Sequence, residues 1–238
     1  MSVQRDVKLR RAAVGTALVL AAPLSVVSWV LVPVSMVDGT EFVSGIASTS
    51  RGTMVASLVT GVLFFPLAVI GVMGLMHLLK ERPRMVGTLG GGLAIMGLTL
   101  NTAAFGAAGT LAEAALSDIA PAQTAALVET TMTGATGILI LFGPFIAAIG
   151  TTMLGVTLYR ARTVPRVPAV MLAIYGPLQV FGFATEVIPI ITASYAVMAL
   201  ALIPVGFLFF RGTGQEWETP STFDGWLDVG RVKEAVAR

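Results

Sequence analysis

Apolar residues occur along this chain in six long runs, which are separated by short polar or charged segments. A run of about 20 apolar residues is long enough to cross the hydrocarbon core of a bilayer as a helix. The pattern therefore predicts an all-α fold, a polytopic transmembrane helical bundle with six spans. The predicted spans lie at about Ala12–Val34, Thr53–Leu79, Met85–Leu111, Gly134–Tyr159, Val167–Ile188 and Ile191–Phe210.

The polar segments divide the chain into a basic N-terminal segment over 1–11, a membrane domain over 12–210 and a polar C-terminal tail over 211–238. Within the membrane domain, residues 35–52 and 112–133 are polar connections. Proline suits the first position of a helix, so Pro121 is expected to open a helical turn in the second connection. In the tail, an interfacial helix over about Phe223–Ala237 and an unstructured chain are both open interpretations.

Two boundaries are less sharply marked than the others. A basic start before an apolar run also describes a secretory signal, but the apolar part of a signal is only about 7–15 residues long. The first run is longer, which favours an uncleaved first helix. No charged loop separates the last two runs, and Pro189 is the expected break between them.

The positions of Lys and Arg indicate how the chain is threaded. Cytoplasmic loops of membrane proteins carry an excess of Lys and Arg. If the N-terminus is cytoplasmic, the inside segments 1–11, 80–84, 159–166 and 211–238 contain 14 of the 15 basic residues, and only Arg51 lies outside. This distribution predicts six spans with both termini cytoplasmic.

Two basic turns within the chain resemble each other. Pro83-Arg84 matches Pro165-Arg166, and the run Leu93–Gly97 matches Leu172–Gly176. Two interpretations remain open: a parallel duplication, or a chance similarity between apolar segments. With its six spans and these turns, the chain resembles a broad family of uncharacterised bacterial six-helix integral membrane proteins over about residues 10–210. The resemblance implies membrane location and an all-helical fold, and it carries over no functional residues.

Composition agrees with this location and excludes several kinds of chemistry. Hydrophobic residues make up 55% of the chain and charged residues 12%, with a mean hydropathy of +0.87, whereas soluble domains have about 25% charged residues. With no cysteine and one histidine, His77, the chain cannot build a zinc site of nitrogen and sulfur ligands. We also find no nucleophile elbow and no phosphate-binding glycine loop. The sequence therefore predicts no catalytic residues, no metal and no cofactor.

Small residues recur at helical spacing in two of the predicted spans. Gly87 and Gly91 share a face of the third span, and Gly143, Ala147 and Gly150 form a stripe on the fourth. Small residues let helix backbones approach closely in lipid. These faces are expected to pack inside one bundle, and the alternative is a dimer seam between two copies of the chain.

Three larger polar residues lie in or near the spans and are the candidates for polar packing or for a transport path. Asn101 and Gln179 are uncharged and suit hydrogen bonds between helices. Glu186 is a carboxylate in an apolar stretch, which by default suggests ion or proton transport. It lies about 30 Å along the helix from Arg166, however, so we expect it near the outer interface, where charge is tolerated.

Two functions from different classes follow from these residues. The first is a non-enzymatic bundle that acts through the lipid bilayer, a second copy of the chain or another membrane protein. The second is a small transporter or channel subunit that uses Asn101, Gln179 and Glu186 along a path. Nucleic acid is not expected as a partner, because the basic residues flank apolar runs and thereby set orientation in the membrane.

Overall fold

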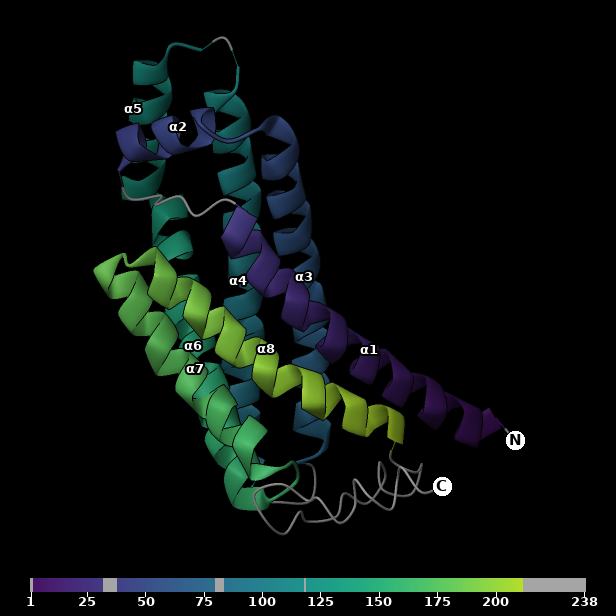
Figure 1. The fold of residues 1–238 in the computed structure, drawn as a ribbon. Helices are drawn as coiled ribbons and strands as arrows, with labels where there is room; N and C mark the ends of the chain where they lie inside the picture. The colour runs from purple at the N-terminus through teal and green to yellow at the C-terminus, as the bar shows by residue number, and fades with distance from the viewer. Residues whose placement is uncertain (1, 32–37, 80–83, 118, 212–238) are drawn as a thin grey trace.

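The computed structural model of the chain describes residues 2–31, 38–79, 84–117 and 119–211. The described residues are almost entirely helical and contain no strand (Figure 1). The helices are α1 Ser2–Leu31, α2 Gly39–Ala47, α3 Arg51–His77, α4 Arg84–Ala115, α5 Pro121–Thr133, α6 Ala135–Ala161, α7 Arg166–Thr185 and α8 Ile188–Arg211. The interfacial helix considered for Phe223–Ala237 lies outside the described residues.

Six of these helices, α1, α3, α4, α6, α7 and α8, are long and apolar enough to cross a membrane. The predicted fold class is therefore confirmed, as the fold of a multi-pass membrane protein. Each of the six helices packs against its neighbours in the order α1, α3, α4, α6, α7 and α8, and α8 packs against α1 again. The spans thus form a closed ring around a shared apolar interior.

The helix of the first span begins earlier than the predicted span, at Ser2 rather than Ala12, and its candidate membrane span is Asp6–Leu31. The basic segment has neither glycine nor proline to break a helix, so α1 continues through it. Arg11 is consequently a helical residue, and it is buried, with only 7% of its side chain exposed. Its Nη2 donates a hydrogen bond to the backbone oxygen of Phe209 near the end of α8, at 2.8 Å.

The turn between α7 and α8 also differs from the prediction. The helix breaks at Glu186 and Val187, and Pro189 is the second residue of α8 instead of the break itself. A proline fits there because the first residues of a helix need no backbone donor. Glu186 ends α7 with a φ of 56°, and the Val187 N–H donates to the Gly182 oxygen at 3.2 Å. The chain thus reverses within two residues, without a polar loop.

Two short helices lie outside the spans at the end where α1 finishes (Figure 1). Residues 35–52, expected to be a polar connection, contain α2, whose start is capped because Asp38 Oδ1 accepts N–H groups from Thr40 at 2.8 Å and Glu41 at 2.9 Å. Pro121 begins α5 as predicted. We call α2 and α5 the cap, since they cover the ends of α3 and α4 with a second apolar core. That core consists of Phe42, Val43, Ile46, Met54, Leu111, Ala112 and Val128.

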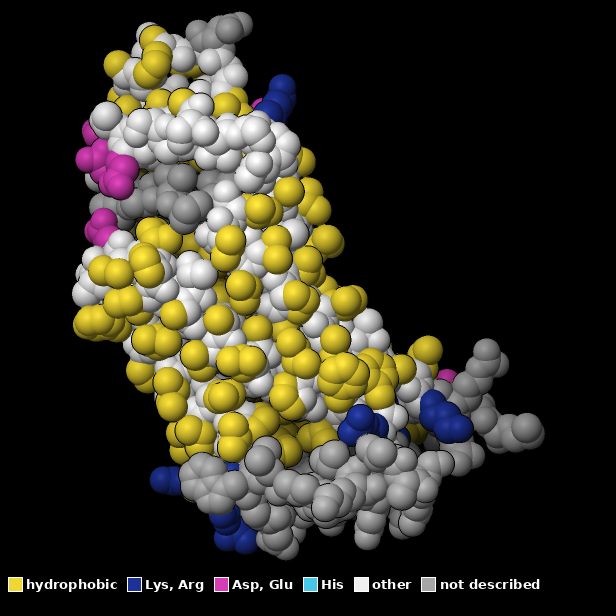
Figure 2. All heavy atoms as spheres, in the orientation of Figure 1, with side chains coloured by type: hydrophobic (Ala, Val, Ile, Leu, Met, Phe, Trp, Pro, Cys, Tyr) yellow, Lys and Arg dark blue, Asp and Glu magenta, His cyan; other side chains and the backbone are white. Residues whose placement is uncertain are grey.

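Charged side chains separate along the bundle (Figure 2). One end, where α1 begins and α8 finishes, carries most of the described basic residues: Lys8, Arg10, Arg11, Arg160, Arg162, Arg166 and Arg211. Most acidic side chains lie toward the opposite end, where Arg51 forms an ion pair with Glu113 at 3.1 Å. The separation agrees with the predicted threading, and the side of the membrane on which each end lies remains a prediction.

Candidate functional site

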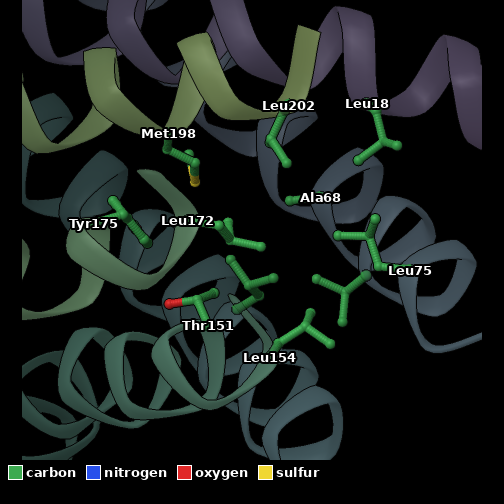
Figure 3. Close-up of a pocket in the computed structure, with 11 residues that line it drawn as sticks. Leu18, Ala68, Leu75, Thr151, Leu154, Leu172, Tyr175, Met198 and Leu202 are labelled. Atoms are coloured by element: carbon green, nitrogen blue, oxygen red, sulfur yellow. The ribbon is translucent and has the colours of Figure 1, made fainter. Parts of the chain in front are cut away.

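The centre of the bundle is closed by aliphatic side chains. A cavity of about 20 Å³ lies there, and every one of the six long helices contributes to its wall (Figure 3). Its lining residues are Leu18, Ala68, Val72, Leu75, Leu98, Thr151, Leu154, Leu172, Tyr175, Met198 and Leu202. The Thr151 hydroxyl is used within its own helix, where it donates to the Ala147 oxygen at 2.8 Å. Thr151 and Tyr175 are thus the only residues of the wall with a polar side-chain atom other than sulfur.

Asn101 lies outside this cavity, at the crossing of α4 and α6. It is 5% exposed, and a Cβ atom added to Gly143 would lie 2.8 Å from its Oδ1. The amide therefore occupies space that the glycine leaves free. This geometry is that of a polar group packed between two helices.

Gln179 is fully buried on α7, and α8 supplies its partner. Its Nε2 donates to the Tyr195 hydroxyl at 3.1 Å, and its Oε1 has no hydrogen-bond partner. Leaving a buried acceptor unpaired costs about 1–3 kcal/mol. Gln179 is thus a polar group that the bundle satisfies only in part.

Aromatic rings from five of the spans surround this hydrogen bond. The Tyr195 ring stacks on Trp29 with the ring centroids 5.7 Å apart, and the Tyr175 ring lies 5.9 Å from Tyr195. The remaining rings of the group are Phe64, Phe65, Phe105 and Phe183. Sequence analysis missed Trp29, Tyr175 and Tyr195, although the spacing of Tyr175 and Gln179 by one helical turn was a usable signal.

A pair of variants tests how well Gln179 is satisfied. We expect Tyr195→Phe to lower the free energy of unfolding by about 1 kcal/mol, because the amide loses its one partner. The free energy of unfolding of Gln179→Met should equal or exceed that of the wild type, because methionine fills similar space without an unpaired oxygen. Unfolding in mixed micelles, followed by circular dichroism, measures both. A Gln179→Met protein much less stable than the wild type would show that the Oε1 atom is satisfied in the membrane.

Glu186 is exposed at the end of α7. Among the described residues, no hydrogen bond or ion pair joins it to Asn101 or Gln179, and those two lie on different helix faces, toward α6 and α8. None of the three candidate polar residues lines the central cavity.

Substitutions at Glu186 are expected to affect the backbone more than the charge. Glu186→Gln should leave the melting temperature unchanged, because the side chain is exposed. Glu186→Gly should stabilise the protein by about 0.5–1 kcal/mol, since only glycine adopts a positive φ without strain. Thermal unfolding in detergent distinguishes the two. Strong destabilisation by Glu186→Gln would show that the carboxylate has a structural partner.

The four glycines singled out from the sequence have different neighbours. A Cβ atom added to Gly150 would meet the backbone of α4, at 2.6 Å from the Gly90 oxygen and 2.7 Å from the Ala94 Cα. At Gly87 it would meet side chains, with Leu79 Cδ1 at 2.7 Å and Thr157 Cγ2 at 3.1 Å. Gly143 faces Asn101 on α4, as described above. These three glycines pack inside the bundle.

Gly91 differs from these three because it faces α3 rather than α6. A Cβ atom there would meet the flexible end of the Met76 side chain. The closest contacts that α4 makes with the stripe on α6 come instead from Gly90, Ala94 and Gly97. The face of α4 that contacts α6 therefore differs, by a rotation about the helix axis, from the face that contains Gly87 and Gly91.

The described residues contain no group of three or more His, Asp or Glu side chains that could hold a metal ion. Comparison of the chain with protein-family models, curated proteins and solved structures found no match. The resemblance to bacterial six-helix membrane proteins therefore stays a prediction. The function is inferred from the residues and the fold of this chain.

Proposed function

We propose that this chain is a non-enzymatic integral membrane protein that acts through partner proteins or through the bilayer. We place it in the bacterial plasma membrane with both termini cytoplasmic. Within the described part of the chain, the cap is the largest folded region outside the spans, and it would present α2 and α5 to a partner.

The observation that carries this proposal is the aliphatic centre of the bundle. A transport path needs polar groups or water along its length. Here the cavity wall draws on all six long helices, and none of Asn101, Gln179 and Glu186 is part of it. A bundle with this interior is suited to hold its helices in one arrangement rather than to conduct.

A second candidate function is transport, and Gln179 favours it. The unpaired Oε1 beside Tyr195 is an acceptor that a proton-carrying group or a small polar solute would satisfy. Transport would require the aliphatic centre to open, since the cavity reaches no polar residue other than Thr151 and Tyr175.

Flux measurements distinguish the two functions. The purified protein is reconstituted into vesicles that contain a pH-sensitive dye for protons or a cation-sensitive dye for cations, and entry is followed under an imposed membrane potential. We expect the rate to equal that of protein-free vesicles. Flux that Gln179→Met abolishes, with Glu186→Gln as the matched polar control, would overturn the proposal and make transport the function.

Reporter fusions test the orientation. Fusions after Lys80, Arg162 and Phe210 are expected to report the cytoplasm, and fusions near Gly39 and Pro121 the outer side, because basic residues in short loops stay inside. An alkaline phosphatase reporter that is active when joined after Phe210 would contradict this orientation, and a green fluorescent reporter at the same position provides the complementary measurement.

A further inference from the structure

The central cavity of the bundle has room for a molecule that the proposed function does not require. Its volume is about 20 Å³, and none of its lining residues exposes more than 7% of its surface. Protein interiors are close-packed, with few voids larger than a water molecule. A void needs about 10–15 Å³ on the same measure to hold one water-sized molecule. The cavity therefore admits one small molecule and is too small for a larger ligand.

The wall of the cavity decides which kind of molecule fits. Only apolar atoms face the space. The Thr151 hydroxyl points away from it, toward the Ala147 oxygen of its own helix (Figure 3). A buried water needs about two to four polar partners, and this wall offers none. The cavity consequently disfavours water, whereas an apolar molecule would enter without losing hydrogen bonds.

The position of the cavity puts an occupant in contact with the whole bundle. Each of the six long helices contributes at least one side chain to the wall, and these side chains converge on one space (Figure 3). A molecule in a void gains the van der Waals contacts that the lining atoms otherwise lack. A ligand that binds only the folded state also stabilises that state. An occupant would therefore favour the closed ring of helices.

We propose that the central cavity binds a single small apolar molecule of the size of dioxygen. The contacts come from aliphatic side chains such as Leu154 and Leu172, and Ala68 is the shortest side chain of the wall. The proposal concerns the interior of the bundle and neither its partners nor its conduction, so its failure and a failure of the proposed function are distinguishable.

Methyl NMR of the full-length protein in micelles under dioxygen pressure tests this site. Dioxygen is paramagnetic and speeds the relaxation of nearby nuclei, and nitrogen at the same pressure is the diamagnetic reference. We expect the enhancement at Leu154 and Leu172 to be severalfold larger than at Leu158, which is equally buried on α6 but does not line the cavity. Leu200, exposed on α8 two residues before the lining residue Leu202, reports the dioxygen dissolved in the micelle at the same depth.

Variants that fill the cavity show whether the effect arises there. Ala68→Leu should lower the enhancement at Leu172 to the level of a buried methyl outside the wall, and leave that at Leu200 unchanged. Val72→Ile adds one methylene to the same wall, is better tolerated by the fold and should lower the enhancement at Leu172 in part. Val62→Ile is the matched control, because it adds the same methylene to an exposed position of α3 and should have no effect.

Three results would overturn the proposal. In the first, the enhancement at Leu154 and Leu172 is no larger than at Leu158. In the second, the enhancement at Leu172 is the same in the wild type, Ala68→Leu and Val72→Ile, while the spectra show that the variants are folded. In the third, a nuclear Overhauser effect joins water to the Leu172 methyl groups and disappears in Ala68→Leu, which would show that water occupies the cavity instead.

Discussion

Replacing Gly150 with leucine is expected to destabilise the bundle more than any other single change considered for this protein. The Cβ atom would meet the backbone of α4 at Ala94 and Gly90, and neither backbone can yield without moving the helix. Overpacking typically costs about 1–3 kcal/mol, and contacts with backbone fall at the upper end of that range or beyond it. The measurement is the free energy of unfolding in mixed micelles.

Two other glycines provide graded controls for this prediction. Gly92→Leu should change stability little, because a Cβ atom there has no neighbour within 4 Å. The stability of Gly91→Leu should lie between those of Gly150→Leu and Gly92→Leu, because the Met76 side chain that the new leucine meets can change rotamer. Equal stability of all three variants would mean that α4 and α6 are not in close contact in the membrane.

Replacing Arg11 with methionine is expected to have the next largest effect. The guanidinium is buried and donates to the Phe209 oxygen at 2.8 Å, close to the C-terminal end of α8. Hydrogen bonds to charged groups contribute about 1.5–3 kcal/mol, and a cation at a helix C-terminus adds a favourable interaction with the helix dipole. Arg11→Met should therefore lower the free energy of unfolding by about that amount and loosen the contact between α1 and α8.

The adjacent arginine is a matched control. Arg10 is exposed, so Arg10→Met removes the same charge without removing a buried hydrogen bond, and its effect on stability should be small. Arg11→Lys keeps the charge but loses the planar guanidinium, and we expect an intermediate stability. If Arg10→Met and Arg11→Met are equally destabilising, net charge rather than the α1–α8 contact is responsible.

The membrane spans could be predicted from the sequence because each span depends only on a run of consecutive apolar residues. Each span must present about 20 consecutive apolar residues to lipid, whatever the other spans do. Five of the six predicted spans consequently overlap their helices with ends displaced by only a few residues, for example Thr53–Leu79 against Arg51–His77. Helix α1 begins at Ser2, before the predicted span, because no glycine or proline interrupts the basic segment. The sequence did not predict α2, because nine residues form too short a pattern to detect within a polar connection.

The contacts between helices were decided only by the tertiary structure. Sequence spacing showed that small residues share a face, but it could not show that Gly91 faces Met76 while Gly90 faces α6. Likewise, Gln179 and Tyr195 are hydrogen-bonded only because the chain reverses direction at Glu186, so that α7 and α8 pack side by side. In lipid, apolar faces are nearly equivalent to one another, so hydropathy does not select a partner. Close packing and the few buried hydrogen bonds make that selection, and both depend on the whole ring of helices.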